Sequence, residues 1–249
     1  MIINSLFEAL KKKKNTIVCD WDNTIQETEY FLLKTVFEIS EKTKQTYLET
    51  YQNFLTKPMD RFLEEDSLYA YRTLLLEEKG AKEYERKLTS SFEQNKTFYT
   101  QAPVFKLAQE LLELLKKKRI KKLIFLTHTP SSFISPERRK IQKLLDLGFS
   151  KFKKKISFVH LPYHKSKGAW IHDCVPSMDF FIDDNLWVLE DFVKQNYCKG
   201  KSLICPIQNL NRSAPERLNK KELLFSGINI YFITSKINRC SSEGRANDC

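Results

Sequence analysis

The sequence lacks several features that would fix its class at once. None of its six cysteines forms a C-x-x-C pair, and no apolar run approaches the roughly 20 residues that a membrane helix needs. Its six glycines are dispersed and it contains no internal repeat. These absences argue against a disulfide framework, a membrane span and a glycine-rich phosphate loop.

We also expect no secretory signal at the amino terminus. Its apolar residues, 1–10, precede the lysines instead of following them, and no small-residue cleavage site appears. His160 and His164 lie four residues apart, but the other two histidines add no ligand spacing, so we interpret the pair as part of a loop beside a strand end. We expect a soluble, cytoplasmic protein with reduced thiols and no membrane partner.

What is present is a globular composition with a strong positive charge. A chain of 249 residues with 41% hydrophobic residues has room for one core and an inserted second unit. The net charge of +11 favours an anionic partner, which could be a phosphorylated metabolite, nucleic acid or an acidic surface. The charge is concentrated in Lys11–Lys14, Lys116–Lys122 and Lys151–Lys155, and each run flanks an expected strand. Solvated helix ends and turns would show the same pattern, so charge alone does not name the anion.

Short apolar, β-branched runs alternate with helical patterns along most of the chain. The expected strands are Thr16–Cys19, Leu123–Leu126, Ile156–His160, Phe180–Ile182, Ser202–Cys205 and Ile228–Phe232. The expected helices are Val104–Leu115, Pro136–Leu147, Lys167–His172 and Asn185–Gln195. This alternation predicts the α/β class, with a Rossmann-like parallel sheet covered by helices on both faces.

One long segment interrupts the alternation. Residues 27–99 contain no convincing strand, and their aromatic and aliphatic residues recur at helical intervals. An unstructured loop of that length would be improbable, so we predict an inserted all-helical domain. The α/β core would then comprise 1–26 and 100–237, and the polar residues 238–249 would form a flexible tail.

Polar side chains follow three of the expected strands directly. The first strand ends in Asp20 and Asp22, followed by Thr24, and the second is followed by Thr127 and His128. Another strand is followed by Asp183 and Asp184, and Lys165 and Lys167 precede it. In an open parallel sheet the reactive crevice lies at the carboxyl ends of the strands, so we expect these groups to form one site.

These residues resemble the four ordered motifs of the haloacid-dehalogenase-like superfamily. The motifs are D-x-D-x-T from Asp20 to Thr24, an apolar strand ending in Thr127, a lysine, and an apolar strand ending in Asp183-Asp184. The match spans residues 16–185, and the helical insertion resembles the superfamily's helical cap. The resemblance implies a magnesium-dependent phosphatase that acts through an aspartyl-phosphate.

The resemblance also implies a role for each residue. Asp20 would be the nucleophile and Asp22 the general acid and base. Thr127 and Lys167 would stabilise the transferred group, with Lys165 as the alternative lysine, and His128 is a further candidate for substrate binding. Magnesium would be held by Asp20, the backbone carbonyl of Asp22, and Asp183 or Asp184.

Several alternatives stay open at this point. Family members that cleave carbon–halogen bonds lack an acid at the position of Asp22, whereas mutases share it, so a phosphomutase remains an alternative to a phosphatase. The basic runs suggest a polynucleotide end phosphatase, although a lid over the site disfavours bulky polymers. Pro206–Arg212 faintly resembles a loop of nucleotidase-like members. A catalytically silent binding protein is the remaining reading, and the substrate itself is not predicted.

Overall fold

The structure is a computed structural model that describes residues 1–11, 14–28, 101–128, 135–162, 165–195, 200–207 and 229–234. The predicted helical insertion and flexible tail lie outside the described residues, apart from Glu27 and Thr28 at the start of the insertion. Most of the predicted Pro206–Arg212 loop lies outside them as well.

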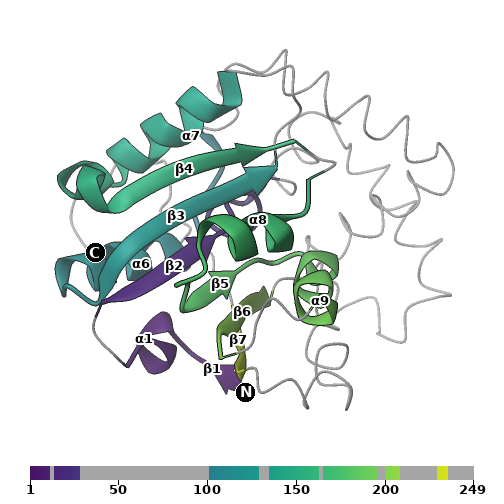
Figure 1. Cartoon of the computed structure of the whole chain (residues 1–249). Helices are drawn as coiled ribbons and strands as arrows, with labels where there is room; N and C mark the ends of the chain where they lie inside the picture. Colours follow the sequence, from purple (N-terminus) through teal and green to yellow (C-terminus); the bar gives the residue numbers. More distant parts are fainter. Residues whose placement is uncertain are drawn as a thin grey trace, which may run out of the picture.

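The core is a single parallel sheet of seven strands in the order β1-β7-β6-β5-β2-β3-β4 (Figure 1). The strands are β1 (Ile2–Ile3), β2 (Asn15–Cys19), β3 (Ile120–His128), β4 (Ile156–Leu161), β5 (Phe180–Ile182), β6 (Ser202–Ile207) and β7 (Asn229–Thr234). All six predicted strands are confirmed to within a few residues, and β1 is an addition at the sheet edge. The α/β class with a parallel sheet is therefore confirmed.

Helices follow the strands as the alternation predicts. They are α1 (Leu6–Ala9), α6 (Lys106–Lys116), α7 (Ser135–Asp146), the 3-10 helix η2 (Phe149–Lys155), α8 (Lys167–Cys174) and α9 (Leu186–Lys194). Side-chain caps fix the starts of the two helices nearest the site. Ser166 accepts a hydrogen bond from the amide of Ala169, and Asn185 accepts one from the amide of Trp187, at 3.2 and 3.0 Å.

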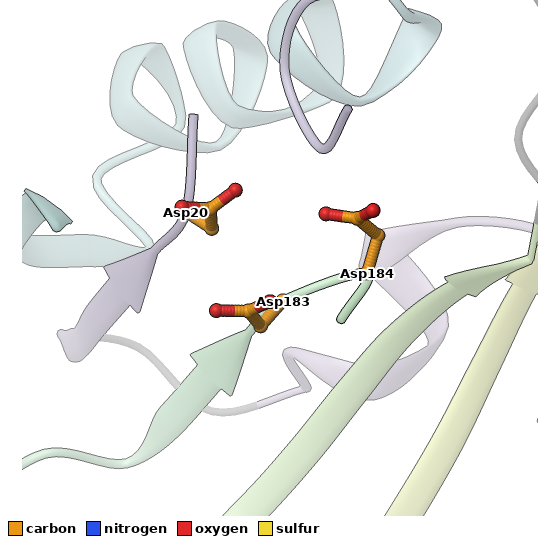
Figure 2. Close-up of side chains that lie close together, drawn as sticks. All are labelled: Asp20, Asp183 and Asp184. Atoms are coloured by element: carbon orange, nitrogen blue, oxygen red, sulfur yellow. The ribbon is translucent and has the colours of Figure 1, made fainter. Parts of the chain in front are cut away.

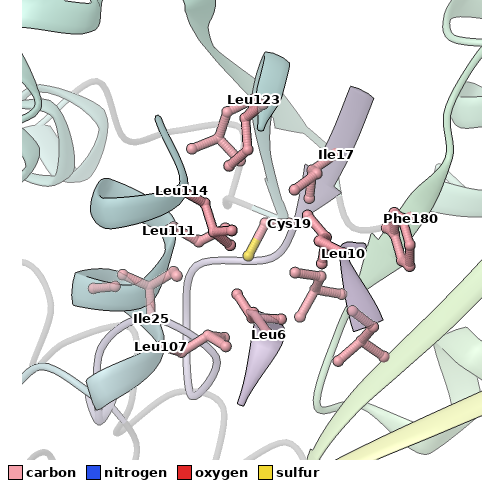
Figure 3. Packing of buried hydrophobic residues seen from close by; sticks show 14 of the residues in the cluster. Leu6, Leu10, Ile17, Cys19, Ile25, Leu107, Leu111, Leu114, Leu123 and Phe180 are labelled. Atoms are coloured by element: carbon pink, nitrogen blue, oxygen red, sulfur yellow. The ribbon is translucent and has the colours of Figure 1, made fainter. Parts of the chain in front are cut away.

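Two apolar layers cover the two faces of the sheet, because neighbouring residues of a strand point to opposite sides. In β2, Ile17 and Cys19 join the layer formed with α1 and α6, which Figure 3 shows, and Val18 joins the layer under α8 and α9. Every residue of β2 is buried, as expected for a central parallel strand. The three described cysteines, at positions 19, 174 and 205, are free thiols.

The strand order places a topological switch point beside β2. The chain runs from β2 outward to β3 and β4, and then returns to the other side of β2 as β5, followed by β6 and β7. Crevices at such points are the usual ligand sites of open parallel sheets. The carboxyl ends of β5, β2 and β3 are therefore adjacent at the centre of the sheet.

The described segments that flank residues 29–100 are hydrogen-bonded to each other. The side chain of Gln26 donates to the carbonyl of Ala102 at 2.9 Å, and the amide of Glu27 donates to the carbonyl of Pro103 at 2.9 Å. The amide of Phe105 in turn donates to the carbonyl of Ile25, also at 2.9 Å. The segments on either side of residues 29–100 thus lie side by side. Within the parts of the chain that the structure describes, no helix combines the length and apolarity needed to cross a membrane.

Candidate active site

A tight turn after β2 directs Asp20 and Asp22 into the crevice. The carbonyl of Trp21 accepts amide hydrogen bonds from residues 24, 25 and 26, and Asn23 adopts a left-handed conformation (φ 55°), which asparagine tolerates better than most residues. The Trp21 side chain is fully buried, donates to Gln26 at 3.1 Å and packs edge-on against Phe125. Trp21 therefore anchors the turn in the core.

Three carboxylates converge at the carboxyl ends of β2 and β5 (Figure 2). One oxygen from each of Asp20, Asp183 and Asp184 lies within 4.8 Å of the others. Asp20 and Asp183 are buried and Asp184 is partly exposed. Figure 2 shows Asp20 approaching from the end of β2, with the other two from the loop after β5.

Lys167 is the lysine that joins this cluster. Its ammonium donates to Asp20 Oδ1 at 2.6 Å and to Asp183 Oδ2 at 2.8 Å, and only 5% of the residue is exposed. Lys165, the alternative lysine, is exposed, and its backbone carbonyl accepts a hydrogen bond from His128 Nε2 at 2.9 Å. The cap at Ser166 sets this difference, because Lys167 begins α8 and faces inward.

Burial and charge shift the pKa values of this cluster. Burial raises the pKa of Asp20 to about 7, a rise that Lys167 opposes and that Asp183 and Asp22 reinforce. Burial alone would lower the pKa of Lys167, but the attraction of Asp183 and Asp20 outweighs it and raises the pKa above its ordinary value. Lys167 is therefore a permanent cation beside Asp20, whose ionised form is disfavoured by burial.

Thr24, the last residue of the first motif, ties β2 to β5. Its hydroxyl donates to Asp184 Oδ1 at 2.8 Å and accepts a hydrogen bond from the Asp184 amide at 3.2 Å. Burial raises the pKa of Asp184, and Asp20 and Asp183 add to the rise. Thr24 thus orients one carboxylate of the cluster from the opposite strand.

Asp22 lies to one side of the three-carboxylate cluster. Its Oδ2 accepts a hydrogen bond from the Thr127 hydroxyl at 3.0 Å and contacts the ammonium of Lys140, which also donates to Thr127 Oγ1 at 3.0 Å. Lys140 belongs to α7 and only 1% of it is exposed. The structure thus brings Asp22 and Thr127 together as the motifs predict, and adds a lysine that the sequence analysis missed.

His128 lies at the end of β3 beside the site. Because the Lys165 carbonyl can only accept, Nε2 of His128 carries the hydrogen in their 2.9 Å contact. Burial lowers the pKa of His128, partly offset by this hydrogen bond. His128 therefore joins the end of β3 to the segment that leads into α8, and its contact with substrate stays a prediction.

The donor set suits a hard divalent cation. Carboxylate oxygens are the ligands that Mg²⁺ prefers, and the clustered carboxylates meet this chemistry without histidine or thiolate. If all are ionised, the four site carboxylates and two buried ammonium groups leave a formal charge of −2, which a divalent cation would balance. Asp20, Asp183 and Asp184 are the side chains placed to hold it.

Comparison with known proteins gives similarity at the level of solved structures alone. No protein-family model matches the chain, and neither does any curated protein. A structure assigned as a haloacid dehalogenase-like hydrolase from Bacteroides fragilis is 12% identical, with a TM-score of 0.48, and the match covers 89% of this chain and 98% of that one.

Two further solved structures are of the same kind. A protein assigned as a HAD-hydrolase from Bacillus subtilis, bound to magnesium, is 16% identical with a TM-score of 0.42, covering 89% of this chain and 95% of that one. The L-2-haloacid dehalogenase from Xanthobacter autotrophicus, with chloropropionic acid covalently bound, is 13% identical with a TM-score of 0.40, covering 82% of each. At this level of similarity, the chemistry of this chain has to be argued from its own site residues.

Proposed function

We propose that this chain is a magnesium-dependent phosphomonoester hydrolase of the haloacid-dehalogenase-like type, acting on a small phosphorylated metabolite or nucleotide. One observation carries the proposal. Asp20 and Asp22 follow the central strand, and the side chains of Lys167, Thr127, Asp183 and Asp184 meet them at the switch point. These are a nucleophile, a proton carrier, donors for a phosphoryl group and a cation site in one crevice.

Asp20 is the nucleophile in this proposal. A carboxylate oxygen of Asp20 forms a bond to phosphorus while the ester P–O bond breaks, and its electron pair leaves with the alcohol oxygen. Lys167, held 2.6 Å from Asp20 Oδ1, is placed to stabilise charge on the transferred group. Water then cleaves the aspartyl-phosphate, which releases inorganic phosphate and restores Asp20.

Asp22 moves the proton in both steps. It gives a proton to the leaving alcohol oxygen, and then takes one from the attacking water. One residue, Trp21, separates it from the nucleophile, and the side chain of Trp21 is buried in the core, so both carboxylates face the crevice. Thr127 binds Asp22 at 3.0 Å and its hydroxyl is close enough to serve the same phosphoryl group.

Magnesium, when bound, would offset the repulsion between the carboxylates and the anionic substrate and polarise the phosphoryl oxygens. The site carboxylates supply the hard ligands for this, and burial raises the pKa of Asp20 to about 7, a rise that Lys167 opposes and that Asp183 and Asp22 reinforce. The described basic runs give little support to the polynucleotide alternative, because they precede β2, β3 and β4 or begin β3 and therefore lie toward the opposite edge of the sheet.

The deciding experiment measures phosphate release from 4-nitrophenyl phosphate with magnesium, with EDTA, and with Asp20→Asn. We expect turnover by the wild type with magnesium and a fall of at least about 10³-fold in either other condition. A panel of nucleotides and sugar phosphates then ranks the substrates, and a product that keeps its phosphate on another hydroxyl would indicate a mutase instead. Turnover that survives Asp20→Asn would refute the proposed nucleophile.

A further inference from the structure

Lys140 is a buried cation that the proposed mechanism does not yet use. It lies in the second turn of α7, and its ammonium contacts Asp22 Oδ2 and donates to Thr127 Oγ1 at 3.0 Å. The next residue, Ile141, is 38% exposed, whereas Lys140 is 1% exposed. Burying the lysine costs desolvation free energy, and leaving the isoleucine exposed forgoes the gain from burying it. The polar contacts of the lysine have to offset both.

The contacts of Asp22 divide its two carboxylate oxygens. Oδ2 is bound by both Lys140 and the Thr127 hydroxyl. Oδ1 is buried and has no hydrogen-bond partner among the residues that the structure describes. A buried carboxylate oxygen without a partner is unusual, and it is the kind of acceptor that is satisfied when a ligand or water arrives.

We propose that Lys140 is a positioning residue that anchors Asp22 through Oδ2, so that Oδ1 is the oxygen that exchanges protons with the leaving alcohol and the attacking water. This rests on the proposed function, in which Asp22 is the proton carrier. Lys140 also donates a hydrogen bond to the Thr127 oxygen. This contact orients the Thr127 hydroxyl, whose hydrogen is then directed away from Lys140. One ammonium thereby sets the orientation of both side chains.

The physical reason is rotation of the carboxylate. About 30% of the Asp22 side chain is exposed, so burial alone does not fix its orientation, and two donors on Oδ2 do. Proton transfer requires the carrier within hydrogen-bond reach of the reacting oxygen, and a displacement of about 1 Å can cost about 10²-fold in rate. Removing Lys140 frees the carboxylate to turn and releases the Thr127 oxygen.

The test compares leaving groups that differ in their need for a proton. The value of kcat/KM reports steps up to phosphorylation of Asp20. In those steps the alcohol of an alkyl phosphate needs the proton from Asp22, whereas 4-nitrophenyl phosphate expels 4-nitrophenolate, which is stable as an anion. For Lys140→Met we expect kcat/KM to fall about 100-fold for the alkyl phosphate and less than about 5-fold for the aryl phosphate. Lys143→Met, the same substitution three residues along α7, is the matched control and should leave the ratio of the two values unchanged.

A double variant separates positioning from a general structural effect. Since Lys140 acts through Asp22, Lys140→Met should change the alkyl phosphate kcat/KM by less than about 3-fold in an Asp22→Asn background. Should Lys140→Met fail to fold, Lys140→Gln, which keeps two N–H donors, is measured instead. We then expect kcat/KM to fall more for the alkyl phosphate than for the aryl phosphate, by a smaller factor than in Lys140→Met.

Two results overturn the inference. An equal loss for both leaving groups would make Lys140 a structural residue, and no loss would make its contacts irrelevant to proton transfer. Both differ from failure of the proposed function. In that case the wild type itself would not turn over either phosphate, or Asp22→Asn would leave the alkyl phosphate rate unchanged.

Discussion

Charged side chains are buried at one edge of the parallel sheet and exposed at the other. At the carboxyl edge, Asp20, Asp183 and Lys167 are buried and bound to one another. At the amino edge, lysines that precede β2, β3 and β4 or begin β3 stand exposed, at positions 14, 116, 117, 118, 121, 122, 151, 153 and 154. The nine residues of β3 separate the two edges by about 25 Å.

In the described part of the chain, the exposed positive charge and the candidate site therefore lie at different edges of the sheet. The buried charges interact in a medium that screens them weakly, and hydrogen bonds fix their positions. The exposed lysines are hydrated, and their fields fade within about 8 Å at physiological salt. The basic runs dominate the formal charge of +11, whereas the candidate site is formally negative.

The largest effect should come from removing the buried cation. Lys167→Met leaves Asp20 and Asp183 without their shared partner, so we expect activity to fall about 10³-fold and stability by about 3–5 kcal/mol at pH 8 in EDTA. Steady-state kinetics and urea unfolding measure the two effects. Lys165→Met, two residues away and exposed, is the control, and it should change either quantity little. Comparable losses in both variants would show that the cluster geometry described above is wrong.

A smaller effect should follow from the raised pKa of Asp20, about 7 against 3.8 for an ordinary aspartate. The native state binds the Asp20 proton more tightly than the unfolded state, so the resulting stability is complete below about pH 4 and lost as pH rises to 7. The difference corresponds to about 4 kcal/mol at most. Asp20→Asn should therefore be more stable than the wild type at pH 8 in EDTA, by about 2–4 kcal/mol.

The sign of this effect is its test. The difference in the free energy of unfolding between Asp20→Asn and the wild type should narrow as pH is lowered from 8 toward 4. The wild-type carboxyl group then becomes protonated and resembles the amide. Urea unfolding at pH 8 and pH 5 is sufficient to measure it. An advantage that stays constant, or grows, on acidification would show that burial does not disfavour the ionised form of Asp20.

The smallest effect should come from the amino edge. Replacing Lys121, Lys122, Lys153 and Lys154 with glutamine removes four exposed positive charges roughly 15–25 Å from the site. Since that distance is about two to three Debye lengths at 0.15 M salt, kcat/KM for a small phosphate should change less than about 2-fold. A tenfold fall in kcat/KM at that salt concentration would mean that the two edges act together in substrate capture. That result would favour a polyanionic substrate such as a polynucleotide.

Much of the site follows from strand ends. Apolar runs predicted β2, β3 and β5, and because parallel strands end at one edge, the polar residues after them had to meet there. The helix opening at Lys167 favoured that lysine over Lys165, and Lys167 is the one bound to the carboxylates. The roles of these residues in catalysis stay predictions, as does the helical insertion.

The elements that were missed are those whose stability comes from distant contacts. Among the described strands, the two residues of β1 pair only with β7, more than 220 positions away. The helix α1 has four residues, too few to give a detectable pattern. Lys140 was missed because hydrophobicity would turn Ile141 inward instead. A signal did exist, since Lys140 lies four residues before the buried Leu144 on one helical face, but the partner that accepts its charge is 118 residues away.

The hydrogen-bonded segments at Gln26 and Ala102 have a consequence for how the length of the chain between them can vary. The hydrogen bonds that join these segments belong to the core, so the two ends of the segment between positions 29 and 100 are held close together. Lengthening a segment with fixed ends costs only about 0.6 kcal/mol per doubling. That segment can therefore change in length at little cost in conformational entropy, while Asp20 and the other site carboxylates, which belong to the described core, keep their places.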